Sequence, residues 1–190
     1  MAHYNTSQFK NGLKVLIDGA PYLIIANEFE KPGKGQAFTR LTLKNYLNGR
    51  VIEKTYKSGH KVEQADIEEE KLCYLYVEGN QYHFMHPETY EQTSVDSNAI
   101  GETKKWLVEQ GLYTVLYWNG RAISAAAESF IELAVDQCPP GVRGNTVSGA
   151  MKNATLSSGA VIKVPLFINQ GDIIKVDTRD SSYVSRAATS

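Results

Sequence analysis

The feature that most constrains the fold is a set of Asp-Gly and Asn-Gly pairs placed between short runs of β-branched and aromatic residues. These pairs are Asp18-Gly19, Asn48-Gly49 and Asn119-Gly120. They favour the two-residue turns of β-hairpins, because both central residues of such a turn take a positive φ. We therefore expect antiparallel hairpins over residues 13–30, 36–59 and 112–126, and an all-β chain.

Most of the remaining chain shows the same pattern. Further strand-like runs cover residues 71–86 (two strands around a turn), 88–95, 129–137, 160–168 and 172–179. Residues 101–111 are the exception, since they predict about two turns of helix with Gly111 as the C-cap. The Gly-, Pro- and Ser-rich residues 138–159 predict a loop. The pattern alone predicts a frayed tail around Tyr183 and Arg186.

This strand spacing is typical of small closed barrels of the SH3-like and OB types. We expect three such domains, over residues 1–64, 65–127 and 128–190. Each would close its own core, so we expect an elongated molecule.

The charge is distributed unevenly along the chain. Residues 1–63 hold ten Lys/Arg against five Asp/Glu, residues 64–126 hold four against ten, and residues 127–190 hold six of each. A basic first third indicates an anionic partner such as nucleic acid.

Several functional classes find no support in the sequence. No apolar run reaches the roughly 18 residues of a membrane helix, and the N-terminus lacks a secretory pattern. Cys73 and Cys138 form no redox or metal motif and predict reduced thiols. His83 and His86 would point to opposite faces of a strand. We expect a cytoplasmic protein with no metal, no cofactor and no enzymatic activity.

One turn carries an unusual residue at its tip. In "FEKPGKGQAF" (residues 29–38), Lys34 lies between Gly33 and Gly35, just after Pro32. Proline stiffens the entry and glycine lets the backbone bend without a side chain. The spacing alone favours a flexible turn with a solubilising lysine, although it also fits a slim finger that presents one amine.

Together with the C-terminal third, this turn resembles the bacterial elongation factor P family. "KPGKGQAF" looks like that family's lysine loop, and "KNATLSSGAVIKVPLFINQG" from Lys152 fits its signature. The resemblance implies an SH3-like (KOW-type) domain followed by two OB-fold domains in an L shape that mimics tRNA. It also implies a factor that binds the ribosome between the P and E sites and relieves stalling at consecutive prolines.

The resemblance also implies roles for particular residues. Lys34 would be modified by β-lysylation, with or without later hydroxylation, by an enzyme similar to lysyl-tRNA synthetase; Pro32, Gly33 and Gly35 would support it. The modified side chain would steady the CCA end of the P-site peptidyl-tRNA on the 70S ribosome. The factor itself would be a monomer. Residues that would contact tRNA or ribosome are Lys31, Arg40, Arg143, Gly144, Asn145, Thr146, Tyr183 and Arg186.

Other interpretations stay open at this point. A general RNA-binding β protein, such as an RNA chaperone, would explain barrels and basic charge but not the lysine loop together with the distant signature. The archaeal and eukaryotic initiation factor 5A family also uses a modified lysine but lacks a third domain. A separate hypothesis concerns Pro139-Pro140-Gly141. This is the kind of sequence that stalls ribosomes when such a factor is absent, so the protein would assist its own synthesis.

Overall fold

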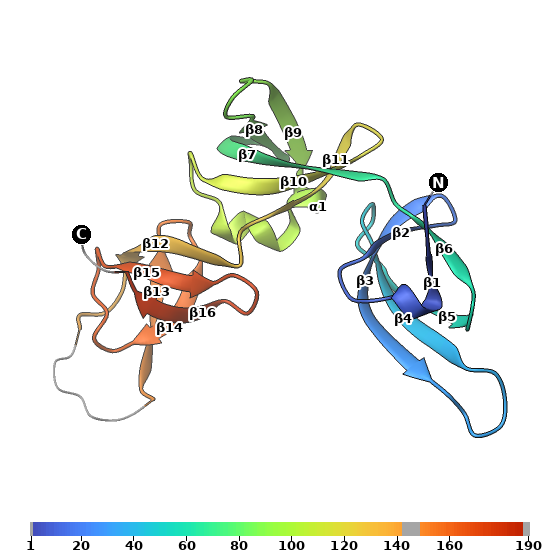
Figure 1. Ribbon diagram of the computed structural model, residues 1–190. Helices are drawn as coiled ribbons and strands as arrows, with labels where there is room; N and C mark the ends of the chain where they lie inside the picture. Colours follow the sequence, from blue (N-terminus) through green and yellow to red (C-terminus); the bar gives the residue numbers. More distant parts are fainter. Residues whose placement is uncertain (1, 142–148, 188–190) are drawn as a thin grey trace. The chain divides into compact units, whose positions relative to one another are not determined.

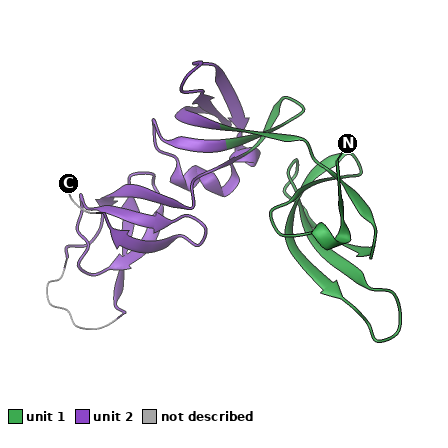
Figure 2. Ribbon diagram, in the orientation of Figure 1, with its two compact units in different colours: residues 1–70, 115–124 green, residues 71–114, 125–190 purple. Residues whose placement is uncertain are grey.

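The computed structural model describes residues 2–141 and 149–187. The chain divides into two compact units, residues 1–70 with 115–124 and residues 71–114 with 125–190 (Figure 2). Strands dominate both units (Figure 1), which confirms the all-β prediction. No helix in the described ranges is long and apolar enough to span a membrane.

The first sheet has six strands in the order β1-β6-β2-β3-β4-β5. Its β2–β3 turn is the predicted hairpin turn, since Asp18 and Gly19 have φ of 51° and 78°. Alternate residues of these strands point inward, so Val15, Ile24 and Leu41 are fully buried. The elements are β1 (His3–Asn5), the 3-10 helix η1 (Thr6–Gln8), β2 (Lys14–Ile17), β3 (Ala20–Glu30), β4 (Phe38–Asn45), β5 (Val51–Lys57) and β6 (Lys61–Gln64).

The second sheet has five strands in the order β11-β10-β7-β8-β9. The predicted turn between β10 and β11 is confirmed, since Asn119 and Gly120 have φ of 50° and 72°. The elements are β7 (Ile67–Glu78), β8 (Gln81–Met85), β9 (Gln92–Asp96), the short helix α1 (Ser97–Ile100), the 3-10 helix η2 (Gly101–Trp106), β10 (Leu112–Trp118) and β11 (Arg121–Ala126).

The helix expected over residues 101–111 is shorter than predicted and of the 3-10 type. It ends at Trp106, because the Tyr113 hydroxyl donates to the Trp106 carbonyl and accepts from the Val108 N–H, both at 2.8 Å. Gly111 does not act as the C-cap. A Cβ on Gly111 would lie 2.8 Å from the Tyr113 hydroxyl, so glycine is needed there for the close approach of that ring.

The third sheet has five strands in the order β14-β13-β12-β15-β16, and β14 also lies beside β16, as in a nearly closed barrel. Two predictions were wrong here. Residues 151–156 form a strand within the expected loop, and residues 182–186 form a strand instead of a frayed tail. The elements are β12 (Phe130–Gln137), β13 (Met151–Leu156), β14 (Val161–Pro165), β15 (Ile173–Asp177) and β16 (Ser182–Arg186).

The core of the third sheet includes a side chain from outside its strands. Trp106 of η2 is 3% exposed and belongs to the same buried cluster as Leu133, Val135 and Ile174. The 3-10 helix η2 and the third sheet therefore share one core within the second unit.

Candidate functional site

The β3–β4 hairpin extends beyond the core of the first sheet (Figure 1). The last four residues of β3, from Asn27 to Glu30, lie outside that core and are all exposed, although the strands stay paired up to Glu30 and Phe38. The Asn27 side-chain amide donates to the Phe9 carbonyl at 3.1 Å. The structure thus forms a two-stranded arm, defined here as residues 28–40, which is tied to the barrel at Asn27.

Lys34 lies in the loop at the end of this arm. Residues 31–36 are all exposed, and no hydrogen bond or ion pair joins Lys34 to any residue in the described ranges. Gly35 has a φ of 121°, a conformation that L side chains rarely adopt. Gly33 has no positive φ, and a Cβ added there would meet no atom within 4 Å. Only one of the two glycines is therefore required by the backbone.

Lys31 and Arg40, the two other residues of the arm predicted to contact tRNA, differ in how far their charges are compensated. Lys31 is exposed beside the loop. Arg40 lies between two carboxylates, with guanidinium nitrogens 3.8 Å from both Glu28 and Glu30. Exposed pairs of this kind contribute about 0–1 kcal/mol. Arg40 therefore links the two strands of the arm and presents less uncompensated charge than Lys31.

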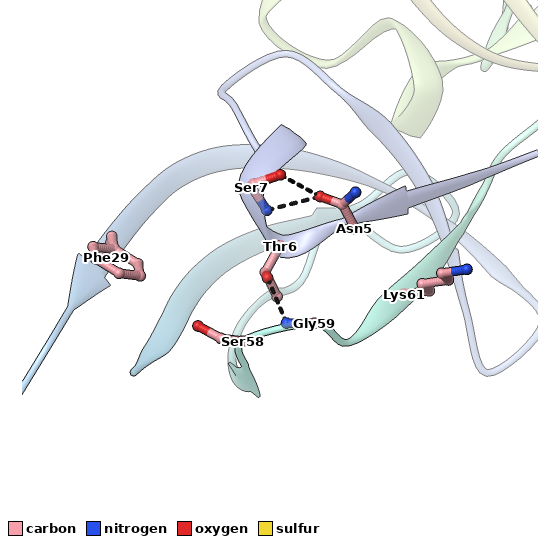
Figure 3. A pocket seen from close by; sticks show the side chains of 7 residues that line it. All are labelled: Asn5, Thr6, Ser7, Phe29, Ser58, Gly59 and Lys61. Atoms are coloured by element: carbon pink, nitrogen blue, oxygen red, sulfur yellow. Dashed lines mark hydrogen bonds between the residues drawn. The ribbon is translucent and has the colours of Figure 1, made fainter. Parts of the chain in front are cut away.

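A hollow of about 450 Å³ lies beside the arm and was not predicted from the sequence (Figure 3). The Thr6 hydroxyl accepts the Gly59 N–H at 3.0 Å, which fixes one wall. Phe29 contributes an apolar surface that is 64% exposed, and Lys61 is the only charged group in the lining. The signal in the sequence was Phe29 itself, an aromatic residue between two glutamates at a strand end. The lining residues are Asn5, Thr6, Ser7, Phe29, Ser58, Gly59 and Lys61.

The C-terminal candidates lie in the second unit. Tyr183 is half-buried and packs against the core of the third sheet, and this burial raises the pKa of its phenol. Arg186 donates to the Asp172 carboxylate at 2.7 Å and to the Phe167 carbonyl at 3.3 Å. Arg143, Gly144, Asn145 and Thr146 lie outside the described residues.

No group of three or more His, Cys, Asp or Glu within residues 2–141 and 149–187 could hold a metal ion. His83 stacks on Tyr76 with ring centroids 4.6 Å apart, and its Nδ1 lies 3.1 Å from the Ser94 hydroxyl. His86 accepts two backbone N–H groups beyond β8. Both histidines therefore have structural partners, and Cys73 and Cys138 are free thiols.

Three family descriptions match the chain in order. Residues 5–62 match the "Elongation factor P (EF-P) KOW-like domain", residues 67–125 match the "Elongation factor P (EF-P) OB domain", and residues 131–186 match "Elongation factor P, C-terminal". Together these ranges take in nearly all of the chain, including the lysine loop and the signature from Lys152.

Two solved structures are similar. Eukaryotic translation initiation factor 5A from Methanococcus jannaschii is 27% identical, with a TM-score of 0.52, and the match covers 65% of this chain and 88% of that one. A translation initiation factor eif-5a family protein from Naegleria fowleri is 17% identical, with a TM-score of 0.47, and the match covers 66% of this chain and 98% of that one.

Proposed function

Because the chain belongs to the elongation factor P family, we propose that it binds the 70S ribosome between the P and E sites and relieves stalling at consecutive prolines. The family consists of translation elongation factors and not of enzymes. The effect of this protein on peptide-bond formation would therefore come from orienting the P-site peptidyl-tRNA. The ribosome's own catalytic centre would then find the reacting groups in a productive geometry.

One observation carries this proposal: a single lysine stands at the end of a paired, anchored arm without any partner in the described structure. Ordering a long side chain against a partner costs up to about 2 kcal/mol of rotamer entropy. The paired strands fix the backbone of the arm up to Glu30 and Phe38, so the ordering cost is limited to the short loop and the Lys34 side chain. Lys34 therefore suits a role in which the arm enters a narrow RNA cleft and the amine, or a group attached to it, steadies the CCA end.

We propose that the same exposure serves modification of Lys34. An enzyme similar to lysyl-tRNA synthetase would join a β-lysyl group to the amine, with or without hydroxylation. Nothing in the arm blocks access, since residues 31–36 are exposed. Intact-mass spectrometry of the native protein would show the added mass, and fragmentation would assign it to Lys34.

Lys31 and Arg40 would contact tRNA backbone near the arm, in a domain with an excess of five positive charges over residues 1–63. Phosphate contacts of this kind position the partner without reading sequence. In the second unit, the residues from Arg143 to Thr146 would face the E site and the anticodon stem, and Tyr183 and Arg186 would contribute to tRNA or ribosome binding. Asn145 stands where the family usually has an acidic residue. The asparagine amide would keep the hydrogen bonding of that residue but lack its charge. The three-domain division and a cytoplasmic, monomeric state complete the proposal.

Replacing Lys34 by Ala tests the proposed function. Translation of a polyproline reporter in extract depleted of the native factor should fall to the level seen without factor, because the amine is lost while the arm keeps its pairing. Lys10→Ala is the matched control, since Lys10 is an exposed lysine of the same unit that lies outside the arm. It removes the same charge, and its expected effect is small.

Two outcomes would contradict the proposal. If Lys34→Ala supports polyproline synthesis as well as wild type does, the tip amine has no such role. If both variants lose RNA affinity to the same extent and polyproline synthesis does not depend on the protein, a general RNA chaperone is the better description.

A further inference from the structure

A chain of hydrogen bonds in the second unit links the C-terminal strand to the segment that follows β12. It begins at Arg186 in β16, whose guanidinium donates to the Asp172 carboxylate at 2.7 Å. The same carboxylate oxygen accepts the Asn169 N–H at 2.8 Å. The Asn169 side-chain oxygen in turn accepts the Gly141 N–H at 2.9 Å. Four residues from three separate parts of the sequence thus form one continuous path.

The turn in the middle of this path is held from several directions. Arg186 also donates to the Phe167 carbonyl at 3.3 Å, and its guanidinium carbon lies 5.6 Å from the centre of the Phe167 ring. The Asn169 side-chain amide donates to the same carbonyl at 3.3 Å. Arg186 therefore fixes both ends of the turn over residues 167–172. The orientation of the Asn169 side chain follows from that turn.

Gly141 is fitted closely to this side chain. A Cβ at Gly141 would lie 2.5 Å from the Asn169 side-chain oxygen and 3.0 Å from its amide carbon. Such separations are too short for any larger residue, so glycine is required for the N–H to reach its acceptor. The Cys138–Gly141 segment is also held by the buried Lys152 ammonium, which donates to the Pro139 carbonyl.

From this path we propose that Arg186 is a positioning residue: through Asp172 and Asn169 it fixes the Cys138–Gly141 segment and hence the direction in which the chain leaves β12. The role of the guanidinium is therefore to hold the Cys138–Gly141 segment in place, and ribosome binding by the second unit would depend on that position. Only this last step depends on the proposed function.

Hydrogen exchange of the Gly141 amide, followed by NMR, tests the path without any ribosome. Arg186→Met should speed that exchange by roughly tenfold, the equivalent of one hydrogen bond to a charged group. Arg186→Lys keeps a cation but loses the fork geometry of the guanidinium, so it should give a smaller acceleration. This variant replaces Arg186→Met in the experiment if the methionine variant does not fold. The matched control is Arg179→Met, because Arg179 pairs with Asp177 but has no link to Asn169. Unchanged Gly141 exchange in both Arg186 variants would overturn the inference.

Ribosome affinity provides the second readout. Asn169→Ala carries no change of charge, yet it should weaken binding as Arg186→Met does, and the double variant should bind no more weakly than the weaker single one. If Asn169→Ala binds like wild type while Arg186→Met does not, the guanidinium contacts the ribosome directly and the inference is wrong. If the wild-type protein does not bind ribosomes at all, the proposed function fails, and the exchange experiment still decides the positioning role.

Discussion

Replacing Trp106 by Ala removes the side chain that joins η2 to the core of the third sheet. Trp106 is 3% exposed and lies in the cluster that includes Leu133 and Ile174. Its carbonyl also accepts the Tyr113 hydroxyl, but that contact uses backbone and survives the substitution. The change therefore removes the apolar contribution of the ring, together with the contact of the Lys105 ammonium 5.4 Å from the ring centroid.

The expected loss is large for a single substitution. A buried tryptophan removes roughly 200 Å² from water, which at about 25 cal/mol per Å² is worth about 5 kcal/mol. Measured Trp→Ala changes in cores cost about 3–5 kcal/mol. For a unit of this size, that loss lowers the melting temperature by roughly 10–20 °C.

Calorimetry of the full chain measures both the size and the distribution of this loss. The ring belongs to the segment before β10 but packs among strands β12 to β15, so it couples the unfolding of both parts of the second unit. In Trp106→Ala we expect the transition of that unit to move down in temperature and to broaden or split. Trp118→Ala is the control, since the only other tryptophan of the chain is partly exposed.

Two results would refute this reasoning. One is a single transition within a few degrees of wild type. The other is an equal loss in Trp118→Ala, which would show that the location of Trp106 between the two parts is not what matters.

Three further predictions concern separate parts of the chain. Burial, with a smaller contribution from Glu69, raises the pKa of Tyr46 to about 12; the unfolded chain releases that proton near pH 10, so stability should fall between pH 10 and 12 by at most about 3 kcal/mol, and urea titrations of Tyr46→Phe should show a smaller slope over this range, the remainder coming from tyrosines such as Tyr56 whose pKa is also raised. Gly35→Ala should reduce polyproline synthesis while leaving the melting temperature nearly unchanged, because the strain at a positive φ is confined to an exposed loop, whereas Gly33→Ala should alter neither. A reporter carrying residues 134–144 should be translated more slowly in extract depleted of the factor, and equal rates would rule out self-dependent synthesis.

Two of the three hairpin turns were predictable because their signals are local, whereas the third was wrong in detail: Asn48 has no positive φ, and the longer segment 46–50 joins β4 to β5. Asp18-Gly19 and Asn119-Gly120 specify a turn by their own backbone preferences, whatever lies elsewhere in the chain. Strand β13 was missed because its inner face includes Lys152, which is 9% exposed, so the alternation of apolar and polar residues is interrupted. The ammonium is tolerated there because it donates to the Pro139 carbonyl, a partner that only the folded chain brings near.

The candidate site likewise has one part that the sequence predicts and another that it does not. The Lys34 loop could be found from composition and order, because Pro, Gly and Lys adjoin each other. The partners of Arg186 could not, since Asp172, Asn169 and Gly141 carry no common motif and meet only through the arrangement of β12, β15 and β16. The hollow beside Phe29 likewise combines residues from η1, the end of β3 and the turn before β6.

The exposed arm has a consequence for how this protein can change over time. Core substitutions must preserve volume, and Gly141 or Gly111 cannot gain even a methyl group without displacing a neighbour. By contrast, the Lys34 side chain has no bonded partner in the described structure. The chemistry at the tip can therefore be altered, by a different appended group or a different side chain, without compensating substitutions in the barrel. The fold and the proposed functional tip at Lys34 can therefore evolve independently.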